Sequence, residues 1–176
     1  MNNKVIIIAE AGVNHNGKLN IAKKLIDAAV AAKVDYVKFQ TFKSEAIVSP
    51  IAKKAAYQSE NVGEVDDSQL KMLKDLELSH ENHLILMDYC NQKGIKFFST
   101  AFDVDGVNYL DSLGLDLFKI PSGEITNYPY LRAVAQKNKP IILSTGMATL
   151  GEIEEAISIL IKNGAERESI IVLHCN

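Results

Sequence analysis

Residues 95–120 read IKFFSTAFDVDGVNYLDSLGLDLFKI and contain one complete unit of the pattern that decides the fold. Within this stretch we expect a short apolar strand at 95–98, a polar turn, a helix at about 104–113 and a second apolar strand at 117–120. An apolar strand followed by a helix and another apolar strand is typical of two parallel strands that a helix connects and covers.

The same alternation extends in both directions along the 176 residues. Further strands are expected at 5–8, 35–39, 141–143 and 170–173. Further helices are expected at 19–30, 79–93, 128–136 and 149–163, and the last of these begins with Thr149 and Glu152 at the spacing of a capping box. The segment at 41–68 has no clean period and is expected to be a long loop. The pattern therefore predicts an α/β fold of six parallel strands and five connecting helices.

Two architectures use this alternation, an open doubly wound sheet and a closed eight-stranded barrel. The loop EAGVNHNG at 10–17 lacks the glycine spacing of a dinucleotide-binding fingerprint, which argues against the Rossmann type. A barrel needs eight units and typically ~250 residues. Because this chain reaches only its sixth strand, the pattern leaves two possibilities, an open sheet or an incomplete barrel.

Composition excludes several classes of protein. Hydrophobic residues make up 47% of the chain and charged residues 23%, which excludes intrinsic disorder. The net charge of −3 gives no overall positive field, so neither nucleic acid nor an anionic membrane is expected as a partner. No apolar run approaches the ~18 residues of a membrane span, no signal peptide is expected, and the cysteines form no disulfide framework. We expect a soluble, cytoplasmic protein.

Polar side chains follow the carboxyl end of every expected strand. Because the carboxyl ends of parallel strands lie on one face of the sheet, these side chains should converge. The set comprises Glu10, Lys38, Gln40, Ser99, Thr100, Lys119, Ser122, Glu124, Ser144, Thr145 and His174. Two lysines among hydroxyl groups are suited to hold a phosphate or a carboxylate.

Some of these residues also have a purely structural interpretation. Lys38 could be an exposed strand residue, or a member of a structural ion-pair cluster in which Glu10 neutralises a lysine. Asn14 and His15 could simply shape a turn.

The remaining histidines and cysteines predict little chemistry. His80 and His83 lie three residues apart and lack a third ligand nearby, so no metal site is assigned to them. Cys90 is expected in the core. Cys175 lies at the active face, but no base is identified beside it, so it is not proposed as a nucleophile.

Six motifs resemble the sialic acid synthase family. They are IIAEAGVNHNG at 7–17, VKFQT at 37–41, FSTAF at 98–102, FKIPSGE at 118–124, ILSTGM at 142–147 and LHCN at 173–176. The motifs cover essentially the whole chain in the family's order. That family includes N-acetylneuraminate synthase and the bacterial legionaminic acid synthases. The resemblance implies a TIM-type (β/α)8 barrel, of which this chain holds about six strands and five helices in a single partial domain, residues 1–176.

The resemblance also implies an activity. The family condenses phosphoenolpyruvate with an N-acetylated hexose, either N-acetylmannosamine or a 2,4-diacetamido-trideoxyhexose, to give a nine-carbon 2-keto sugar acid and phosphate. Matching positions imply catalytic roles for Glu10, Lys38, Lys119 and Glu124, and substrate-binding roles for Asn14, Gln40, Thr100, Ser122, Ser144 and His174. Within this set the phosphoenolpyruvate positions are Lys38, Thr100, Lys119, Ser122 and Ser144, and Gln40 matches a sugar contact.

Part of the family's pattern lies outside this sequence. The family's two metal-binding histidines, its last two barrel strands and its C-terminal antifreeze-like domain follow the sixth strand. We therefore expect a truncated chain with an exposed apolar sheet edge. Ligands for Mn²⁺ or Mg²⁺ are expected beyond residue 176, as is homodimerisation of the full-length parent.

Two alternative functions stay open. One is a Schiff-base aldolase with Lys119 as the nucleophile. The other is an inactive half-barrel fragment that binds anions. The sequence does not identify the sugar, the metal, or which carboxylate acts as the acid or base.

Overall fold

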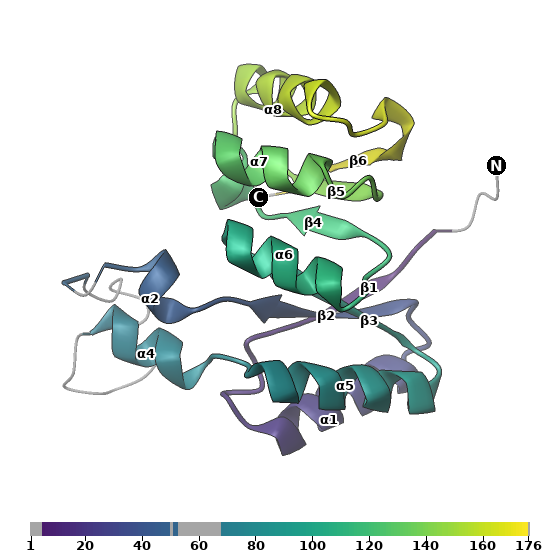
Figure 1. Ribbon diagram of the computed structural model, residues 1–176. Coiled ribbons are helices and arrows are strands. Elements are labelled where there is room, and N and C mark those ends of the chain that lie inside the picture. Colours follow the sequence, from purple (N-terminus) through teal and green to yellow (C-terminus); the bar gives the residue numbers. More distant parts are fainter. Residues whose placement is uncertain (1–4, 50, 53–67, 176) are drawn as a thin grey trace.

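The computed structural model describes residues 5–49, 51–52 and 68–175, in which strands and helices alternate (Figure 1). The elements are β1 (Ile8–Gly12), α1 (Leu19–Ala31), β2 (Tyr36–Thr41), α2 (Ser44–Ile47), α4 (Gln69–Asp75), α5 (His80–Lys93), β3 (Lys96–Ala101), α6 (Val104–Ser112), β4 (Phe118–Ile120), the 3-10 helix η1 (Ser122–Glu124), α7 (Tyr128–Ala135), β5 (Ile141–Ser144), α8 (Leu150–Lys162), the 3-10 helix η2 (Arg167–Ser169) and β6 (Ile170–Leu173).

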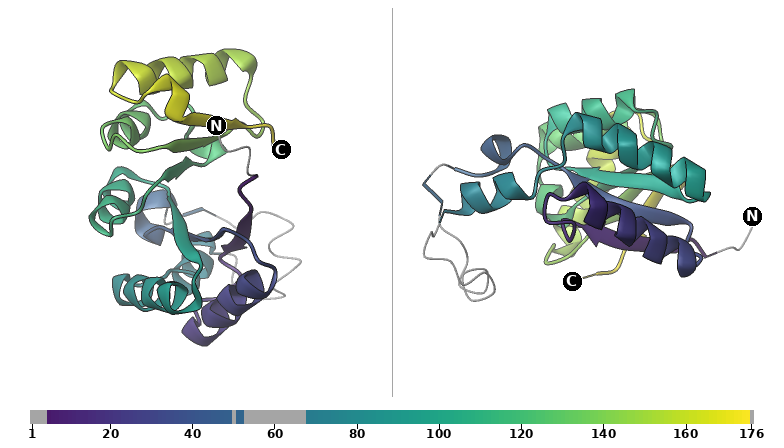
Figure 2. Two further views of the ribbon diagram at one scale, coloured as in Figure 1. Left: turned by 90° about the vertical axis from the view of Figure 1, so that its right-hand side faces the viewer. Right: turned by 90° about the horizontal axis from the view of Figure 1, so that it is seen from below.

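The six strands of the described residues form two three-stranded sheets, with the orders β1-β2-β3 and β4-β5-β6. Every pairing within them is parallel. β3 and β4 lie against each other, so the strands follow one another in chain order across both sheets. The helices α1, α5, α6, α7 and α8 form an arc around the outer side of the strands (Figure 2). This arrangement is a partial barrel, and it confirms the predicted parallel α/β fold.

Local signals in the sequence explain where the helices begin and end. Ser79 caps α5 by accepting a hydrogen bond from the Asn82 N–H, and Gly94 ends it in the left-handed conformation with φ 72°. At the start of α8, Thr149 and Glu152 form the predicted capping box. Side-chain caps and a left-handed glycine therefore fix these helix ends as predicted.

The bounds predicted for the first strand are wrong. The sequence predicts residues 5–8, whereas the ladder of β1 with β2 begins at the pair Ile8 and Tyr36. Val5 and Ile6 lie before that ladder and are 77% and 55% exposed. The prediction placed the strand in the apolar run. The observed strand instead extends through the polar stretch up to Gly12, because the residues of β2 pair with residues 8 to 12.

The long segment at 41–68 is less irregular than predicted. It includes the helix α2, and residues 53–67 lie outside the described residues. The helix α4 follows directly and was not predicted; its N-cap is Ser68. The five connecting helices are thus confirmed, and α2 and α4 are additional.

Apolar side chains pack on both faces of the strands. The larger cluster lies between the strands and the helices and includes Ile26, Leu86, Leu110, Leu131 and Leu160. The smaller cluster lies on the inner face, and we call it the apolar layer: Ile8, Tyr36, Phe98, Leu117, Ile142 and Leu173. A cavity of about 500 Å³ opens beside this layer.

The outermost strand of the second sheet carries exposed apolar side chains. On β6, Ile171 and Val172 are 48% and 45% exposed. Among the described strands β6 pairs only with β5, so the expected apolar sheet edge is present. None of the helices in the described part of the chain is long and apolar enough to cross a membrane.

Candidate active site

A layer of polar side chains lies next to the apolar layer, toward the carboxyl ends of the strands. Alternate residues of a strand point to the same face, so the residue two positions after each member of the apolar layer also points inward. For β1 to β5 these residues are Glu10, Lys38, Thr100, Lys119 and Ser144, and we call these five the polar layer. The inner face of the strands thus changes from apolar to polar within two residues.

Glu10 and Lys38 form an ion pair on adjacent strands. The Lys38 Nζ lies 2.8 Å from the Glu10 Oε2, and their side chains are 5% and 54% exposed, respectively. Burial lowers the pKa of Lys38, the Glu10 carboxylate opposes this effect, and the positive charge of Lys119 adds to it. The buried Lys38 ammonium group is thus only partly compensated by Glu10, so an anion bound beside it would be stabilised.

Gly12 makes room for two of the predicted site residues. It has φ +51°, and a Cβ atom there would lie 3.2 Å from the Glu10 Oε1 and 3.6 Å from the Gln40 Nε2. The register of β1 against β2 shifts between Glu10 and Gly12. Glu10 and Gln40 therefore both lie beside Gly12. Gly12 was not among the predicted site residues, although a glycine inside a strand that is bordered by polar site residues is a signal of close approach.

Thr100 has a hydroxyl group without a partner. The residue is 2% exposed, and among the described residues nothing forms a hydrogen bond with its Oγ1. A buried hydroxyl that lacks a hydrogen bond is costly, so this position calls for a ligand or a water molecule.

The His15 side chain fits the turn-shaping interpretation. Its Nδ1 accepts a hydrogen bond from the Gly17 N–H at 3.0 Å, within the loop after β1. Burial lowers the pKa of His15, which favours the neutral imidazole. Its Nε2 is buried without a partner among the described residues.

Ser122 and Glu124 lie in η1, directly after β4. The Asn127 Nδ2 donates a hydrogen bond to the Glu124 Oε2 at 2.6 Å and so orients that carboxylate. The Tyr130 hydroxyl donates to the Ala101 carbonyl at 2.9 Å and thereby connects α7 to the end of β3. These contacts hold the loop after β4 next to the end of the first sheet.

The end of β6 brings a cysteine, not a histidine, toward the polar layer. A backbone hydrogen bond from Thr145 lowers the pKa of the Cys175 thiol, with further contributions from Ser144 and Lys119. Cys175 is two positions after Leu173 of the apolar layer, in line with the active-face position predicted for it.

Two further residues of the predicted site lie at the surface. The side chains of Asn14 and His174 are exposed. Within the described part of the chain, no hydrogen bond or ion pair joins either of them to the polar layer.

Comparisons with known proteins identify the family of the chain. Residues 25–176 match the NeuB family. The chain belongs to the NeuB family. A NeuB-family relative named N,N'-diacetyllegionaminic acid synthase, from Campylobacter jejuni, is 56% identical over 172 residues, which is 98% of this chain and 51% of the relative. A protein of the same name from Legionella pneumophila is 48% identical, covering 96% of this chain and 48% of the relative.

A solved NeuB-type structure confirms the partial barrel. The N-acetylneuraminic acid (sialic acid) synthetase of Leptospira borgpetersenii superposes with a TM-score of 0.81 and 38% identity, covering 99% of this chain and 55% of that one. The chain thus spans about half the length of the relatives it matches.

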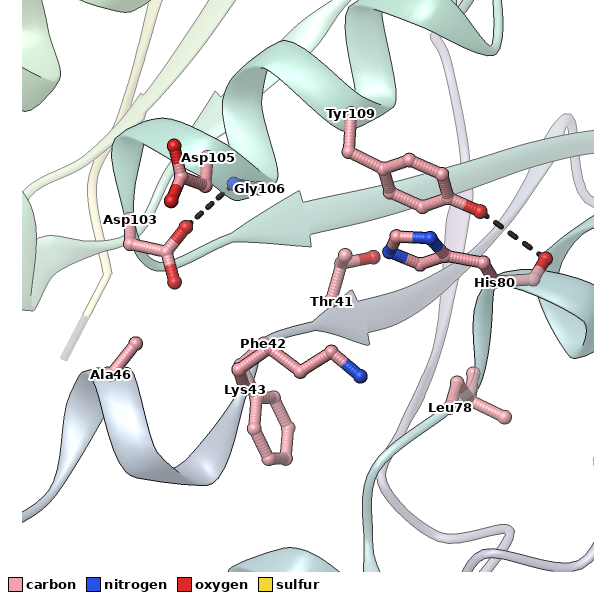
Figure 3. A pocket seen from close by; sticks show the side chains of 10 residues that line it. All are labelled: Thr41, Phe42, Lys43, Ala46, Leu78, His80, Asp103, Asp105, Gly106 and Tyr109. Atoms are coloured by element: carbon pink, nitrogen blue, oxygen red, sulfur yellow. Dashed lines mark hydrogen bonds between the residues drawn. The ribbon is translucent and has the colours of Figure 1, made fainter.

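The described residues of this NeuB-family chain do not form a metal site. Among them, no group of three or more His, Cys, Asp or Glu side chains could hold a metal ion. The His80 ring instead stacks on the Tyr109 ring, with 3.8 Å between centroids. These rings line a pocket of about 200 Å³ between α2 and α6 (Figure 3). None of the site residues predicted from the sequence lines this pocket.

Proposed function

We propose that this chain supplies the phosphoenolpyruvate-binding part of a sialic-acid-type synthase. The proposed reaction condenses phosphoenolpyruvate with an N-acetylated hexose and water, giving a nine-carbon 2-keto sugar acid and phosphate. The observation that carries the proposal is the polar layer, where the buried Lys38 on β2 and the unpartnered buried hydroxyl of Thr100 on the adjacent β3 point to the same face. The names of the synthases that the chain resembles support the same reaction.

The chemistry of the polar layer suits a substrate with two anionic groups. Lys38 and Lys119 donate charge-assisted hydrogen bonds, and Thr100 and Ser144 donate neutral ones. Glu10 already holds one N–H of Lys38. The ammonium group has two further N–H donors for a phosphate or carboxylate oxygen.

The proposed reaction proceeds in three steps. Carbon three of phosphoenolpyruvate attacks the aldehyde carbon of the open-chain sugar, which leaves positive charge at carbon two. Water adds at carbon two, and Glu10 or Glu124 accepts its proton. The resulting adduct loses phosphate by cleavage of its carbon–oxygen bond, and Lys38 and Lys119 stabilise the departing charge.

A divalent metal ion, Mn²⁺ or Mg²⁺, is part of the proposal, with ligands outside these 176 residues. Such an ion would supply Lewis-acid polarisation of the sugar aldehyde. The comparisons do not favour the Schiff-base alternative at Lys119, because the relatives above are named as synthases.

The first test is the binding of phosphoenolpyruvate to the 176-residue chain by isothermal titration calorimetry. We expect binding that Lys119→Met abolishes. Lys24→Met is the matched control, because it removes the same charge from an exposed position on α1. Absence of binding to the unchanged chain, or equal binding by the Lys119 variant, would refute the proposal.

The second test measures phosphate release with and without N-acetylmannosamine and manganese. Sugar-dependent release would show that the chain assembles a working site. Binding without release would favour the anion-binding fragment. In a full-length protein that contains this chain, Lys119→Ala should abolish turnover and leave the fold intact, and near-normal phosphate release would contradict the assigned role.

A further inference from the structure

A chain of buried hydrogen bonds runs behind the polar layer, between the strands and α5. The Thr41 Oγ1 lies 2.7 Å from the His83 Nε2 and 2.6 Å from the Ser99 Oγ. At the other side of the imidazole, the His83 Nδ1 lies 2.8 Å from the carbonyl oxygen of Ser79. His83 and Ser99 are fully buried, and Thr41 is 7% exposed.

The donor and the acceptor of each of these hydrogen bonds can be assigned by starting from the Ser79 carbonyl. A carbonyl oxygen only accepts, so the His83 Nδ1 carries a proton and donates it to Ser79. In the neutral imidazole the Nε2 then accepts from the Thr41 hydroxyl. Thr41 has a single hydroxyl proton, so its oxygen accepts the proton of Ser99. Burial lowers the pKa of His83, which favours this neutral state.

The hydrogen-bonded residues Thr41 and Ser99 lie next to two predicted substrate contacts in the sequence. In the ladder of β2 with β3, Gln40 stands opposite Thr100. Thr41 follows Gln40, and Ser99 precedes Thr100. Successive side chains of a strand point to opposite faces, so the hydrogen bonds are formed on the outer face while Gln40 and Thr100 face inward.

We propose that His83, acting through Thr41 and Ser99, is a positioning residue that fixes the carboxyl ends of β2 and β3 and thereby holds Gln40 and Thr100 in place. The identification of Gln40 and Thr100 as substrate contacts rests on the proposed function. The positioning of Gln40 and Thr100 by these hydrogen bonds is present in the substrate-free protein and can be tested there.

Apolar packing around these hydrogen bonds makes them rigid. The His83 ring packs edge-on against the Phe97 ring at 6.2 Å, in an otherwise apolar region between the strands and the helices. Hydrogen bonds are stronger in such a region, and losing one partner leaves the other unsatisfied. One imidazole therefore ties the first turn of α5 to the ends of two strands.

The test compares variants that remove single members of the chain with variants that preserve them. Thr41→Val removes the hydroxyl and keeps the shape, whereas Thr41→Ser keeps the hydroxyl. His83→Leu removes the acceptor, whereas His83→Gln places an amide oxygen near the position of Nε2. Leu84→Ala is the control, because Leu84 lies on the same helix and its side chain is 57% exposed.

The first measurement is NMR spectroscopy of the protein without substrate. In Thr41→Val and His83→Leu, we expect the signals of the Thr100 methyl group and the Gln40 side-chain amide to shift and broaden. The conservative variants and the control should leave both signals in place. Unchanged signals in folded Thr41→Val and His83→Leu would overturn the proposal, as would equal changes in Leu84→Ala.

The second measurement is the dissociation constant for phosphoenolpyruvate. Loss of one buried hydrogen bond predicts about a 5- to 30-fold weaker affinity in Thr41→Val and His83→Leu, and recovery in the conservative variants. If the unchanged chain does not bind phosphoenolpyruvate, the proposed function fails, and the NMR comparison still decides the positioning role.

A measurement on the unchanged chain covers the case in which the disruptive variants do not fold. Nitrogen-15 NMR distinguishes the two neutral tautomers of a histidine. The hydrogen bonds above require His83 to carry its proton on Nδ1. A proton on Nε2 would leave no proton for the contact between the His83 Nδ1 and the Ser79 carbonyl oxygen, and would overturn the proposal.

Discussion

The ion pair of Glu10 and Lys38 predicts an asymmetric response to mutation. Its two members differ in burial, since the Lys38 side chain is 5% exposed and the Glu10 side chain 54%. Glu10→Gln leaves a buried ammonium group without its counter-charge. Lys38→Met removes the buried charge and leaves a carboxylate that water can solvate. We therefore expect Glu10→Gln to destabilise the fold and Lys38→Met to leave it intact.

The expected magnitudes follow from this difference in burial. Removing one partner of a buried ion pair costs ~3–5 kcal/mol. Exposure of Glu10 reduces the value of this pair, so we expect Glu10→Gln to lower the free energy of unfolding by about 1–2 kcal/mol. For Lys38→Met we expect a change between zero and about 1 kcal/mol in the stabilising direction. The same variant should lose its affinity for phosphoenolpyruvate.

The pH dependence gives a second signature. Burial lowers the pKa of Lys38 in the folded chain below its ordinary value of 10.5. Between the lowered pKa of the folded chain and 10.5, the unfolded chain binds more protons than the folded chain, so the free energy of unfolding rises with pH. Below the lowered pKa, Lys38 is charged in both states and the full cost of burying its charge reduces the stability of the fold. Without the Glu10 carboxylate the folded pKa falls further, and the window of Glu10→Gln should extend to lower pH. Lys38→Met should lack this rise.

Urea unfolding at neutral pH and at about pH 9.5 measures both effects. Each variant is compared with the unchanged chain, and equal denaturant slopes indicate that the unfolded states are comparable. Equal destabilisation by Glu10→Gln and Lys38→Met would refute this reasoning, because it would mean that the pair behaves as one surface ion pair.

Three further predictions follow from single contacts. Tyr130→Phe should lower the free energy of unfolding by about 1–3 kcal/mol, because the Ala101 carbonyl loses a buried donor, and an unchanged urea midpoint would contradict this. Iodoacetamide should modify Cys175 much faster than Cys90, because a backbone hydrogen bond lowers the pKa of the exposed Cys175 thiol while burial raises that of Cys90 to about 12. Peptide mass spectrometry measures both rates, and faster labelling of Cys90 would disprove the assigned environments. Thr149→Ala should cost about 1 kcal/mol through loss of the cap of α8, and Thr149→Ser should recover most of it in the same melt.

The sequence was sufficient to predict the six strands and the five connecting helices, but not α2 and α4. Strand and helix periods differ clearly, and local caps such as Ser79 and Thr149 mark the starts of helices. The first strand was misplaced because its bounds depend on where β2 begins, which no local pattern shows. The convergence of Glu10 and Lys38 could be predicted because parallel strands share an orientation.

The contacts behind the site could not be predicted in the same way. Thr41 and His83 are 42 residues apart and meet only through packing of α5 against the strands. A histidine near a helix start gives no signal of its partner. Cys175, by contrast, was predictable, because it stands two residues after Leu173 as Lys119 stands two residues after Leu117.

The spacing of the apolar and polar layers also affects which mutations this protein can accept. Both layers are built from the same strands and lie one inward-pointing residue apart, a distance of about 6.5–7 Å. Selection for folding therefore acts on the apolar layer, and selection for ligand specificity acts on the polar layer. A mutant library confined to the apolar layer would search for thermostability, and one confined to the polar layer would search for new anionic substrates on an unaltered scaffold.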